Sequence, residues 1–509
     1  MGQSGQVDLE MDERIIKKID LQARIEPFVY EQLNEITYEV EVKTASSLLT
    51  WNRLDIAFKL CYVDYNKVIP EFASSVYYQD IYAQGLGSFV ELGNSAKNSF
   101  EAYKDAFDKT MTSVAKEGFN ADISLIPLAN DGSIYNGAHR TACAIACEKD
   151  IAAVQLDLPP MVCDYRFFYE RKAPEHILEI AVNKFIEYAP DNVYLAFLWP
   201  SGEKRRNEAE ALFSKVIYRK EIKLTHKGAF NLLANLYEGM DWAGNEVDGY
   251  PGVNQKLVEC FPELGPCTVV AFQAEKLSVV RLIKEQIRSI YNIGFSSIHI
   301  TDTKSEAIKI ANLLFNHNGL HFLNHASPYR YLGLYERLKQ FEAFLAQNNV
   351  DRSEVLIDGS STLALYGIRK SDDIDFLIND NDRIISQSKE FEIHDQELIF
   401  HKKDKLDLIL DPRHYFIFKG FKFVSFEQLY SMKLARNQSK DANDCAMMKA
   451  FVSNKMLNKI IAGLKQNLLY SRVKFARMRV KLFYGFLKET GLYAPIRHIY
   501  YSIKTFKKK

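Results

Sequence analysis

Three aspartates in the last third of the sequence have the type and spacing that metal-dependent phosphate chemistry requires. Asp373 and Asp375 are two residues apart, and Asp407 lies between apolar neighbours further on. On a strand, residues two apart project from the same face, where two carboxylates repel each other unless a cation lies between them. Carboxylate oxygens are ligands that Mg²⁺ prefers. The sequence therefore predicts a magnesium site at Asp373 and Asp375.

The elements that would position these aspartates are short. Residues 355–357 predict a strand, 362–366 a short helix, and 372–378 a second strand that carries Asp373 and Asp375. Gly359 and Ser360 lie between the first strand and the helix, where backbone N–H groups favour phosphate oxygens.

Two further strands are predicted downstream, at 397–400 and 405–410. If these strands adjoin the others, Asp407 faces the same site. The alternative is a solvated acidic turn at 371–375 and an unrelated aspartate at position 407.

This arrangement resembles the nucleotidyltransferase fold of the DNA polymerase β superfamily. That superfamily has a Gly-Ser turn, an Asp-x-Asp strand and a third Asp on a later strand, which match Gly359-Ser360, Asp373-Ile374-Asp375 and Asp407. The stretch 433–444 also looks like the helical region of its small-molecule members. The resemblance covers about 100 of the 509 residues.

The resemblance implies a two-metal, in-line transfer from an NTP substrate, with pyrophosphate as the leaving group. Its catalytic and metal-binding residues would be Asp373, Asp375 and Asp407, which would hold two Mg²⁺ ions. The implied nucleotide-binding residues near this site are Gly359, Ser360, Arg436 and Lys440. Helix-surface charges such as Arg436 and Lys440 are more often simply solvated, Asp441 and Asp444 share that ambiguity, and an inactive version of the fold is a further alternative.

A second group of polar residues lies at 130–140. A strand at 123–128, a turn at 130–133, a helix at 141–147 and a strand at 152–156 are predicted in this order. A helix N-terminus that carries a cation favours anions, and an arginine adds bidentate phosphate geometry.

The turn Gly137-Ala138-His139-Arg140 is similar to the phosphate-gripping turn of the ParB/sulfiredoxin-like superfamily. The resemblance assigns Gly137, His139 and Arg140 to nucleotide binding. The first, acidic motif of that family is not identifiable here, so catalysis by this domain stays open. The alternative is that Arg140 pairs with a carboxylate and His139 is a satisfied turn residue.

The middle of the chain contains histidines and two polar, aromatic loops. His317, His321 and His325 are spaced by four and, with His299 and Asp302, suggest a metal site. However, the turn-forming residues 316–319 would break the helix that this site needs. The loops at 237–239 and 241–244 are of the kind that often carries sites, but no family or chemistry is assigned to this part.

Charge and composition limit the classes of function. Lys+Arg and Asp+Glu are both 65, which argues against a protein that coats nucleic acid by charge alone. The segment 455–509 differs, with 14 Lys+Arg against the single acid Glu489. It predicts a basic amphipathic helix that binds an anionic membrane through 470–509. RNA binding and a merely solvated helix are the alternatives.

We expect a cytoplasmic protein, with a peripheral position at the inner face of the membrane as a second expectation. No run of about 18 apolar residues predicts a transmembrane helix, and the first residues do not resemble a secretory signal. The seven scattered cysteines are typical of a reducing compartment.

These patterns predict a multidomain chain of α/β and α+β class. Residues 1–165 would be a helical lead-in, with 1–120 mostly helical, followed by a ParB/sulfiredoxin-like α+β domain that binds nucleotide. Residues 166–335 would form an α/β domain of unknown role, 336–454 a small mixed-sheet nucleotidyltransferase-like domain, and 455–509 the basic helical tail.

The predicted function is a Mg²⁺-dependent nucleotidyltransferase that moves a nucleoside monophosphate from an NTP to a small-molecule or sugar acceptor. A loose resemblance of the tail to the basic ends of peripheral glycosyltransferases places this reaction in bacterial surface polysaccharide synthesis. One alternative is a small-molecule kinase that uses the ParB/sulfiredoxin-like domain. The other is a nucleotide-gated DNA-binding protein, which the zero net charge and the lack of a helix-turn-helix signature disfavour.

Overall fold

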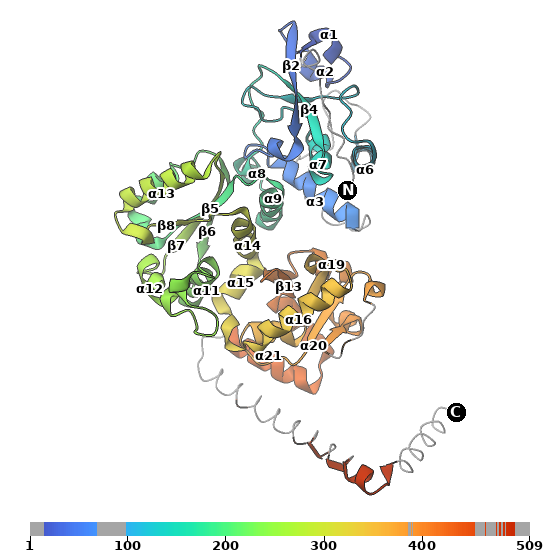
Figure 1. Ribbon diagram of the computed structural model, residues 1–509, viewed down its shortest axis with the longest axis vertical. Coiled ribbons are helices and arrows are strands. Elements are labelled where there is room, and N and C mark those ends of the chain that lie inside the picture. Colours follow the sequence, from blue (N-terminus) through green and yellow to red (C-terminus); the bar gives the residue numbers. More distant parts are fainter. Residues whose placement is uncertain are drawn as a thin grey trace, which may run out of the picture. The chain divides into compact units, whose positions relative to one another are not determined.

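The computed structural model describes residues 15–68, 98–384, 388 and 390–452, with 464, 475, 478–479, 482–483 and 485–493. Within these residues the chain is a mixed α/β multidomain protein with three sheets (Figure 1), so the predicted class is confirmed in this general form. By compactness the chain forms two units, Met1–Asp395 with Lys403–Phe426, and Gln396–Lys402 with Glu427–Lys509.

The first sheet has the strand order β1-β2-β4-β3. β2 is antiparallel to β1 and β4, and β3 is parallel to β4. Helix α7 connects the two parallel strands and packs against α3 (Figure 1), so the predicted strand–turn–helix–strand order is confirmed. The elements of this part are β1 (Ile15–Lys17), α1 (Lys18–Leu21), α2 (Pro27–Tyr30), β2 (Thr37–Thr44), α3 (Asp55–Val68), α6 (Phe100–Glu117), β3 (Ile126–Leu128), α7 (Ala138–Ala146) and β4 (Asp150–Gln155).

The expectation of mostly helical structure over 1–120 is wrong for β2. In this strand Tyr38 and Val40 are buried while Glu39 is exposed, the period-two pattern of a half-buried strand. The two buried side chains join a core that includes Leu21 and Val154. β2 pairs with β4 along five residues and so connects β1 to the rest of the sheet.

The second sheet is antiparallel throughout, with the order β6-β7-β5-β8. The apolar runs at 267–272 and 298–300 lie in β7 and β8. The elements of this part are α8 (Tyr165–Glu170), α9 (Glu175–Tyr188), β5 (Val193–Leu198), α10 (Arg206–Glu210), β6 (Val216–Lys223), α11 (His226–Leu236), the 3-10 turn η5 (Asp241–Ala243), α12 (Pro251–Cys260), β7 (Pro266–Gln273), α13 (Leu277–Tyr291), the turn η6 (Gly294–Ser296), β8 (Ile298–Ile300), α14 (Lys304–Leu314) and α15 (His317–His325).

The third sheet is mixed, with the order β11-β10-β9-β13-β12. β10 is antiparallel to β9 and parallel to β11, and β9 is parallel to β13. One face packs on α16, whose Phe341 ring lies 5.0 Å from Phe376 and 5.2 Å from Phe391. The elements of this part are α16 (Gly333–Gln347), β9 (Val355–Asp358), α17 (Ser360–Leu365), β10 (Ile374–Ile378), β11 (Phe391–Ile393), α19 (Lys405–Leu410), β12 (Tyr415–Phe418) and β13 (Phe421–Val424).

The two strands predicted at 397–400 and 405–410 are wrong, because both segments are helical. They form α18 (Leu398–His401) and α19. Leu408, Ile409 and Leu410 are buried in succession, whereas a half-buried strand would bury every second residue. A short apolar run does not by itself distinguish a buried helix from a strand.

The second unit contains α18 with the helices α20 (Phe426–Arg436), apart from Phe426 itself, and α21 (Ser439–Val452). Lys433 is buried and lies 2.9 Å from Oδ2 of Asp444 and 3.6 Å from Oδ1 of Asp441. These ion pairs join α20 to α21. Among the residues that the structure describes, no helix is both long enough and apolar enough to cross a membrane.

Candidate functional site

Three carboxylates lie in register across the third sheet. Asp375 of β10 pairs with Asp358 of β9 on one side and with Glu392 of β11 on the other. Paired residues on adjacent strands project from the same face of a sheet. The strand order therefore gathers Asp358, Asp375 and Glu392 into one group, which we call the carboxylate row.

Gly359 brings the backbone close to this row. Its φ of 64° and ψ of −136° lie in a region that residues with a side chain rarely adopt. A Cβ atom at this position would lie 2.5 Å from Oδ2 of Asp375. The glycine thus permits both the turn and the approach of the carboxylate. The predicted order of strand, Gly-Ser turn and helix is confirmed, since β9 ends at Asp358 and α17 begins at Ser360.

Serine hydroxyls hold Asp373 next to the same turn. Ser360 Oγ donates to Oδ1 of Asp373 at 3.3 Å and lies 2.8 Å from Oγ of Ser371. The hydroxyls of Ser361 and Ser371 donate to the Asp373 carbonyl oxygen at 2.9 and 2.7 Å. Asp373 itself directly precedes β10, so its backbone is fixed while its carboxylate remains only half-buried.

The electrostatics of the row favour added positive charge. Burial raises the pKa of Asp375 to about 6; Asp373, Asp358 and Glu392 raise it as well, and His394 acts in the opposite direction. Nδ1 of His394 lies 3.0 Å from Oδ2 of Asp358, which is fully buried. Asp375 is therefore a carboxylate whose ionised form is disfavoured by its surroundings.

Two carboxylates of the row, together with Asp373, fit Mg²⁺. Asp373, Asp375 and Glu392 supply only oxygen donors, the ligand type of hard divalent cations. In the part of the chain that the structure describes, no three or more His, Cys, Asp or Glu side chains form a ready-made metal cage. Phosphate-transfer sites commonly bind Mg²⁺ through one or two carboxylates together with substrate phosphates, and Asp375 with a neighbouring carboxylate meets that requirement.

Asp407, the predicted third carboxylate, lies on helix α19 and not on a strand. Burial raises its pKa, and the largest electrostatic contributions come from Asp404, Asp411, His414 and Lys403 in its own segment. The strand pairing that would have directed it toward Asp373 and Asp375 does not exist. In the sheet itself, the carboxylate beside Asp375 on the neighbouring strand belongs to Glu392.

Three residues of the site were not predicted from the sequence: Asp358, Glu392 and His394. Asp358 directly precedes Gly359 and is the last residue of β9. Glu392 and His394 are two apart in a Phe-Glu-Ile-His run, whose alternation is the pattern of a strand with a polar face. That alternation was the available signal, but pairing with β10 is needed to place Glu392 beside Asp375.

The two predicted phosphate ligands of the helical region lie in the second unit. The Arg436 guanidinium donates to both carboxylate oxygens of Asp441 at 2.9 and 2.7 Å and lies 3.1 Å from Glu397. It is 4% exposed at the side chain, so its charge serves a buried ion pair. Lys440 is exposed.

The Gly-Ala-His-Arg turn has the predicted geometry at the start of α7. Gly137 has φ 94°, and a Cβ there would lie 2.7 Å from Cδ1 of Ile126. The Arg140 guanidinium pairs with Glu26 and also donates to Ser124. The carboxylate of Glu26 thus occupies the arginine, as the alternative interpretation of this turn predicted.

His139, in the same turn, packs against helix α6. Its ring meets the Phe107 ring edge-on at 4.6 Å and lies 6.4 Å from the Tyr103 ring. Both aromatic partners are buried. The histidine therefore contributes to the packing of α7 on α6.

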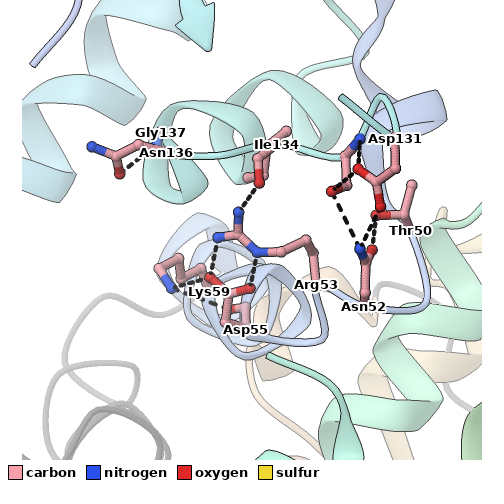
Figure 2. A network of polar contacts seen from close by, with 10 residues as sticks. Thr50, Asn52, Arg53, Asp55, Lys59, Asp131, Ile134, Asn136 and Gly137 are labelled. Carbon is pink, nitrogen blue, oxygen red and sulfur yellow. Dashed lines mark hydrogen bonds and ion pairs between the residues drawn. The ribbon is translucent and has the colours of Figure 1, made fainter. Parts of the chain in front are cut away.

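A buried ionic network supports the loop that leads into this turn (Figure 2). The Arg53 guanidinium donates to Asp55 at 2.8 and 2.9 Å and also to the Ile134 carbonyl. Burial alone would raise the pKa of Asp55, but the charges of Arg53 and Lys59 and their hydrogen bonds hold that pKa well below its usual range. Both cations pair with Asp55, and the Arg53 guanidinium reaches the Ile134 carbonyl, so this network positions the loop at 134.

A neighbouring set of hydrogen bonds fixes the preceding turn (Figure 2). Nδ2 of Asn52 donates to Oδ2 of Asp131 at 3.1 Å and to Oγ of Ser133 at 3.2 Å. The Ser133 hydroxyl in turn donates to Asp131 at 2.6 Å. Asn136 accepts a hydrogen bond from its neighbour Gly137. The loop is thus held to the 50–55 segment on both sides.

The spaced histidines lie on one helix, because 316–319 does not break it. Asn316 caps α15, and its side chain accepts hydrogen bonds from the backbone of Asn318 and Gly319. Burial, with His325 and His317, lowers the pKa of His321 to about 4, and its Nδ1 lies 2.9 Å from the Tyr366 hydroxyl. His299, expected to join this group, lies instead 3.0 Å from Glu306.

Most of the basic tail lies outside the described residues, including Arg472, Lys474, Arg477 and Lys481 of the predicted membrane segment. Several described apolar side chains of this segment are exposed: Phe475, Met478, Leu482, Phe483 and Phe486.

Comparison with models of known protein families, with curated proteins and with solved structures gives no significant match to this chain in any of the three. The two resemblances therefore rest on the residues described above.

Proposed function

We propose that the third sheet carries a Mg²⁺-dependent nucleotidyltransferase site, which moves a nucleoside monophosphate from an NTP to a hydroxyl of a small-molecule or sugar acceptor. The supporting observation is the convergence of Asp373 and the carboxylate row on the Gly359 turn. No lysine or arginine is among the main charges that act on Asp375, so its oxygen atoms are available to a metal ion. Gly359 in the adjacent turn has no side chain, so a phosphate group can approach its backbone. A metal–triphosphate substrate requires both features.

Each residue has a role in this proposal. Asp373 and Asp375 hold Mg²⁺, and the bound metal would offset the charge of the triphosphate and of the leaving pyrophosphate. The Gly359 backbone and the Ser360 hydroxyl orient the β- and γ-phosphates. Glu392, the neighbour of Asp375 in the row, is favoured over Asp407 as the third carboxylate, which accepts the proton of the acceptor hydroxyl.

The experiment is a transfer assay with the full chain. NTPs labelled at the α-phosphate are incubated with Mg²⁺ and a panel of sugars and small alcohols, and pyrophosphate release is followed together with label on the acceptor. We expect the double variant Asp373→Asn/Asp375→Asn to lose transfer. Asp372→Asn, which removes an exposed neighbouring carboxylate, is the matched control and keeps it. Transfer that survives in the double variant refutes the proposal.

The same assay separates the alternatives. Release of NDP with phosphate on the acceptor would support a kinase, and salt-dependent retention on DNA would support a DNA-binding protein. No contact in the described residues favours the kinase, since Glu26 already engages Arg140.

The cellular context belongs to the same proposal. Surface polysaccharide synthesis at the cytoplasmic face of a membrane requires that the tail bind anionic lipid. We expect the full chain to co-sediment with vesicles that contain an anionic lipid, and we expect deletion of 470–509 to abolish this. Co-sedimentation that persists after the deletion rules out the membrane role of the tail.

A further inference from the structure

A cavity of about 500 Å³ opens beside the second sheet, away from every residue of the proposed transfer site. It is lined by α12, α13, the end of β8 and the two aromatic loops that the sequence singled out at 237–239 and 241–244. Its size lies in the range of small-molecule sites.

Aromatic rings form one part of the lining. Tyr237 meets Trp242 at 4.9 Å and His299 at 5.2 Å, both in edge-on arrangements. Trp242 is 49% exposed and Phe295 is 78% exposed, although such rings bury large apolar areas when packed. Two flat faces are therefore available to a planar ligand at the edge of the cavity.

Cations form the other part. Lys256, Lys284 and Arg288 line the cavity, and Glu259 is the acidic residue of the lining. Lys284 also pairs with the exposed Asp302 outside the lining, at 2.8 Å. The Lys256 ammonium is fixed, because it donates to the carbonyl of Phe295 and to the hydroxyl of Ser296, each at 3.0 Å.

The guanidinium of Arg288 packs on one of these aromatic rings, Phe295. Its guanidinium lies 4.7 Å from the centre of the Phe295 ring. The buried Nε has no hydrogen-bond partner within the described chain, although the terminal nitrogen bonds Glu285 at 2.6 Å. The donor capacity of this arginine is thus not used up inside the protein.

The aromatic loop is held in place by backbone packing. A Cβ on Gly252 of α12 would lie 1.9 Å from the carbonyl oxygen of Trp242. Helix and loop therefore touch backbone to backbone, which fixes the backbone of Trp242, while its ring packs edge-on against Tyr237. A loop whose backbone is already fixed loses less entropy when it binds.

We infer that this cavity binds a nucleotide, that is, a small organic anion with a planar base and a phosphate group. The base stacks on Trp242 and Phe295, and the phosphate is bound by Arg288 and by Lys284, whose ammonium it shares with Asp302. This activity is separate from the proposed transfer site, because it uses other elements and requires no metal.

The test is isothermal titration of the full chain with the four nucleoside monophosphates in EDTA. Parallel titrations use the matching nucleosides, ribose 5-phosphate and inorganic phosphate. We expect at least one nucleotide to bind more tightly than its nucleoside and than either phosphate compound. Failure of all four nucleotides to bind, or equal affinity for ribose 5-phosphate, overturns the inference.

Variants locate the binding. Trp242→Ala and Lys284→Ala each weaken nucleotide binding by about tenfold or more, the usual cost of losing a stacked ring or a phosphate contact. Arg281→Ala is the matched control, because it removes an exposed cation from the same helix outside the cavity, and it leaves affinity unchanged. Asp375→Asn also leaves it unchanged. Binding lost in Asp375→Asn, or kept in both cavity variants, refutes the assignment.

Discussion

The substitution Gly359→Ala tests the site at its tightest point. The new Cβ would be placed 2.5 Å from Oδ2 of Asp375, whereas ordinary van der Waals contact needs about 3.4 Å or more. The carboxylate, the turn or both must therefore shift by close to 1 Å. A displacement of this size at reacting groups commonly costs about 100-fold in rate.

The backbone adds a second effect. The φ of Gly359 is 64° with ψ −136°, and a residue with a Cβ in such a region costs roughly 1–3 kcal/mol. We therefore expect Gly359→Ala to lower both stability and transfer, and a control must separate the two.

Gly420→Ala is that control. Gly420, in the turn between β12 and β13 of the same sheet, has φ 80°, but its nearest neighbour is the flexible end of Arg352 at 3.0 Å. The control should lose stability and keep transfer, whereas Gly359→Ala should lose both. Thermal unfolding and initial rates of pyrophosphate release measure the two quantities. Full activity in Gly359→Ala, or equal loss in Gly420→Ala, would show that the approach of Gly359 to Asp375 has no role in the reaction.

Three further outcomes are expected. In metal-free buffer Asp375→Asn stabilises the protein at pH 8 by up to about 3 kcal/mol, since the folded pKa near 6 lies above the usual 3.8. The cost of ionisation therefore grows as the pH rises from about 4 to about 6 and is constant above that range. The gain measured by urea unfolding should shrink as the pH falls toward 4; a gain that stays constant with pH contradicts the electrostatics. We expect Glu392→Gln to reduce the rate of transfer more than Asp407→Asn does. A larger loss in Asp407→Asn would instead identify Asp407 as the third carboxylate. Arg436→Ala removes one of the two cations beside the buried Asp441, and Lys433 remains. The loss costs up to about 3–5 kcal/mol; calorimetry should show this with the affinity for NTP unchanged.

Local patterns were sufficient for the framework of the third sheet. Gly359 between an apolar strand and a small-residue helix, and the Asp-x-Asp segment after it, were predictable because turn chemistry and alternation act over a few residues. The same alternation is present in β2, but predicted helices flank it, and its few residues do not outweigh them.

Non-local pairing explains the part that was not predictable. Glu392 becomes a site residue only because β11 pairs with β10 in parallel and sets it opposite Asp375, and register between strands distant in sequence is not encoded in either strand alone. The strand predicted at 405–410 is wrong for a related reason. A run of three buried apolar residues is compatible with a helix that packs on a sheet as well as with a strand. The sequence predicts phosphate binding by Arg140 and Arg436, but in the fold each arginine pairs with a carboxylate. For Arg140 this is Glu26, which is distant in sequence, and for Arg436 it is Asp441 on the next helix.

The energetics of the carboxylate row distinguish a functional role from a structural one. Asp358 is fully buried with His394 beside it, which is how a structural carboxylate is accommodated. Asp375 is different, because burial and three acidic neighbours together oppose its ionisation, and the charge of His394 offsets them only in part. Groups disfavoured in this way concentrate at functional sites, where a ligand offsets the cost. A divalent cation that binds the row should therefore raise the unfolding temperature of the native chain more than that of Asp375→Asn, since the variant loses the central carboxylate of the row. Equal stabilisation of both proteins would place the cation elsewhere and leave the row without its proposed ligand.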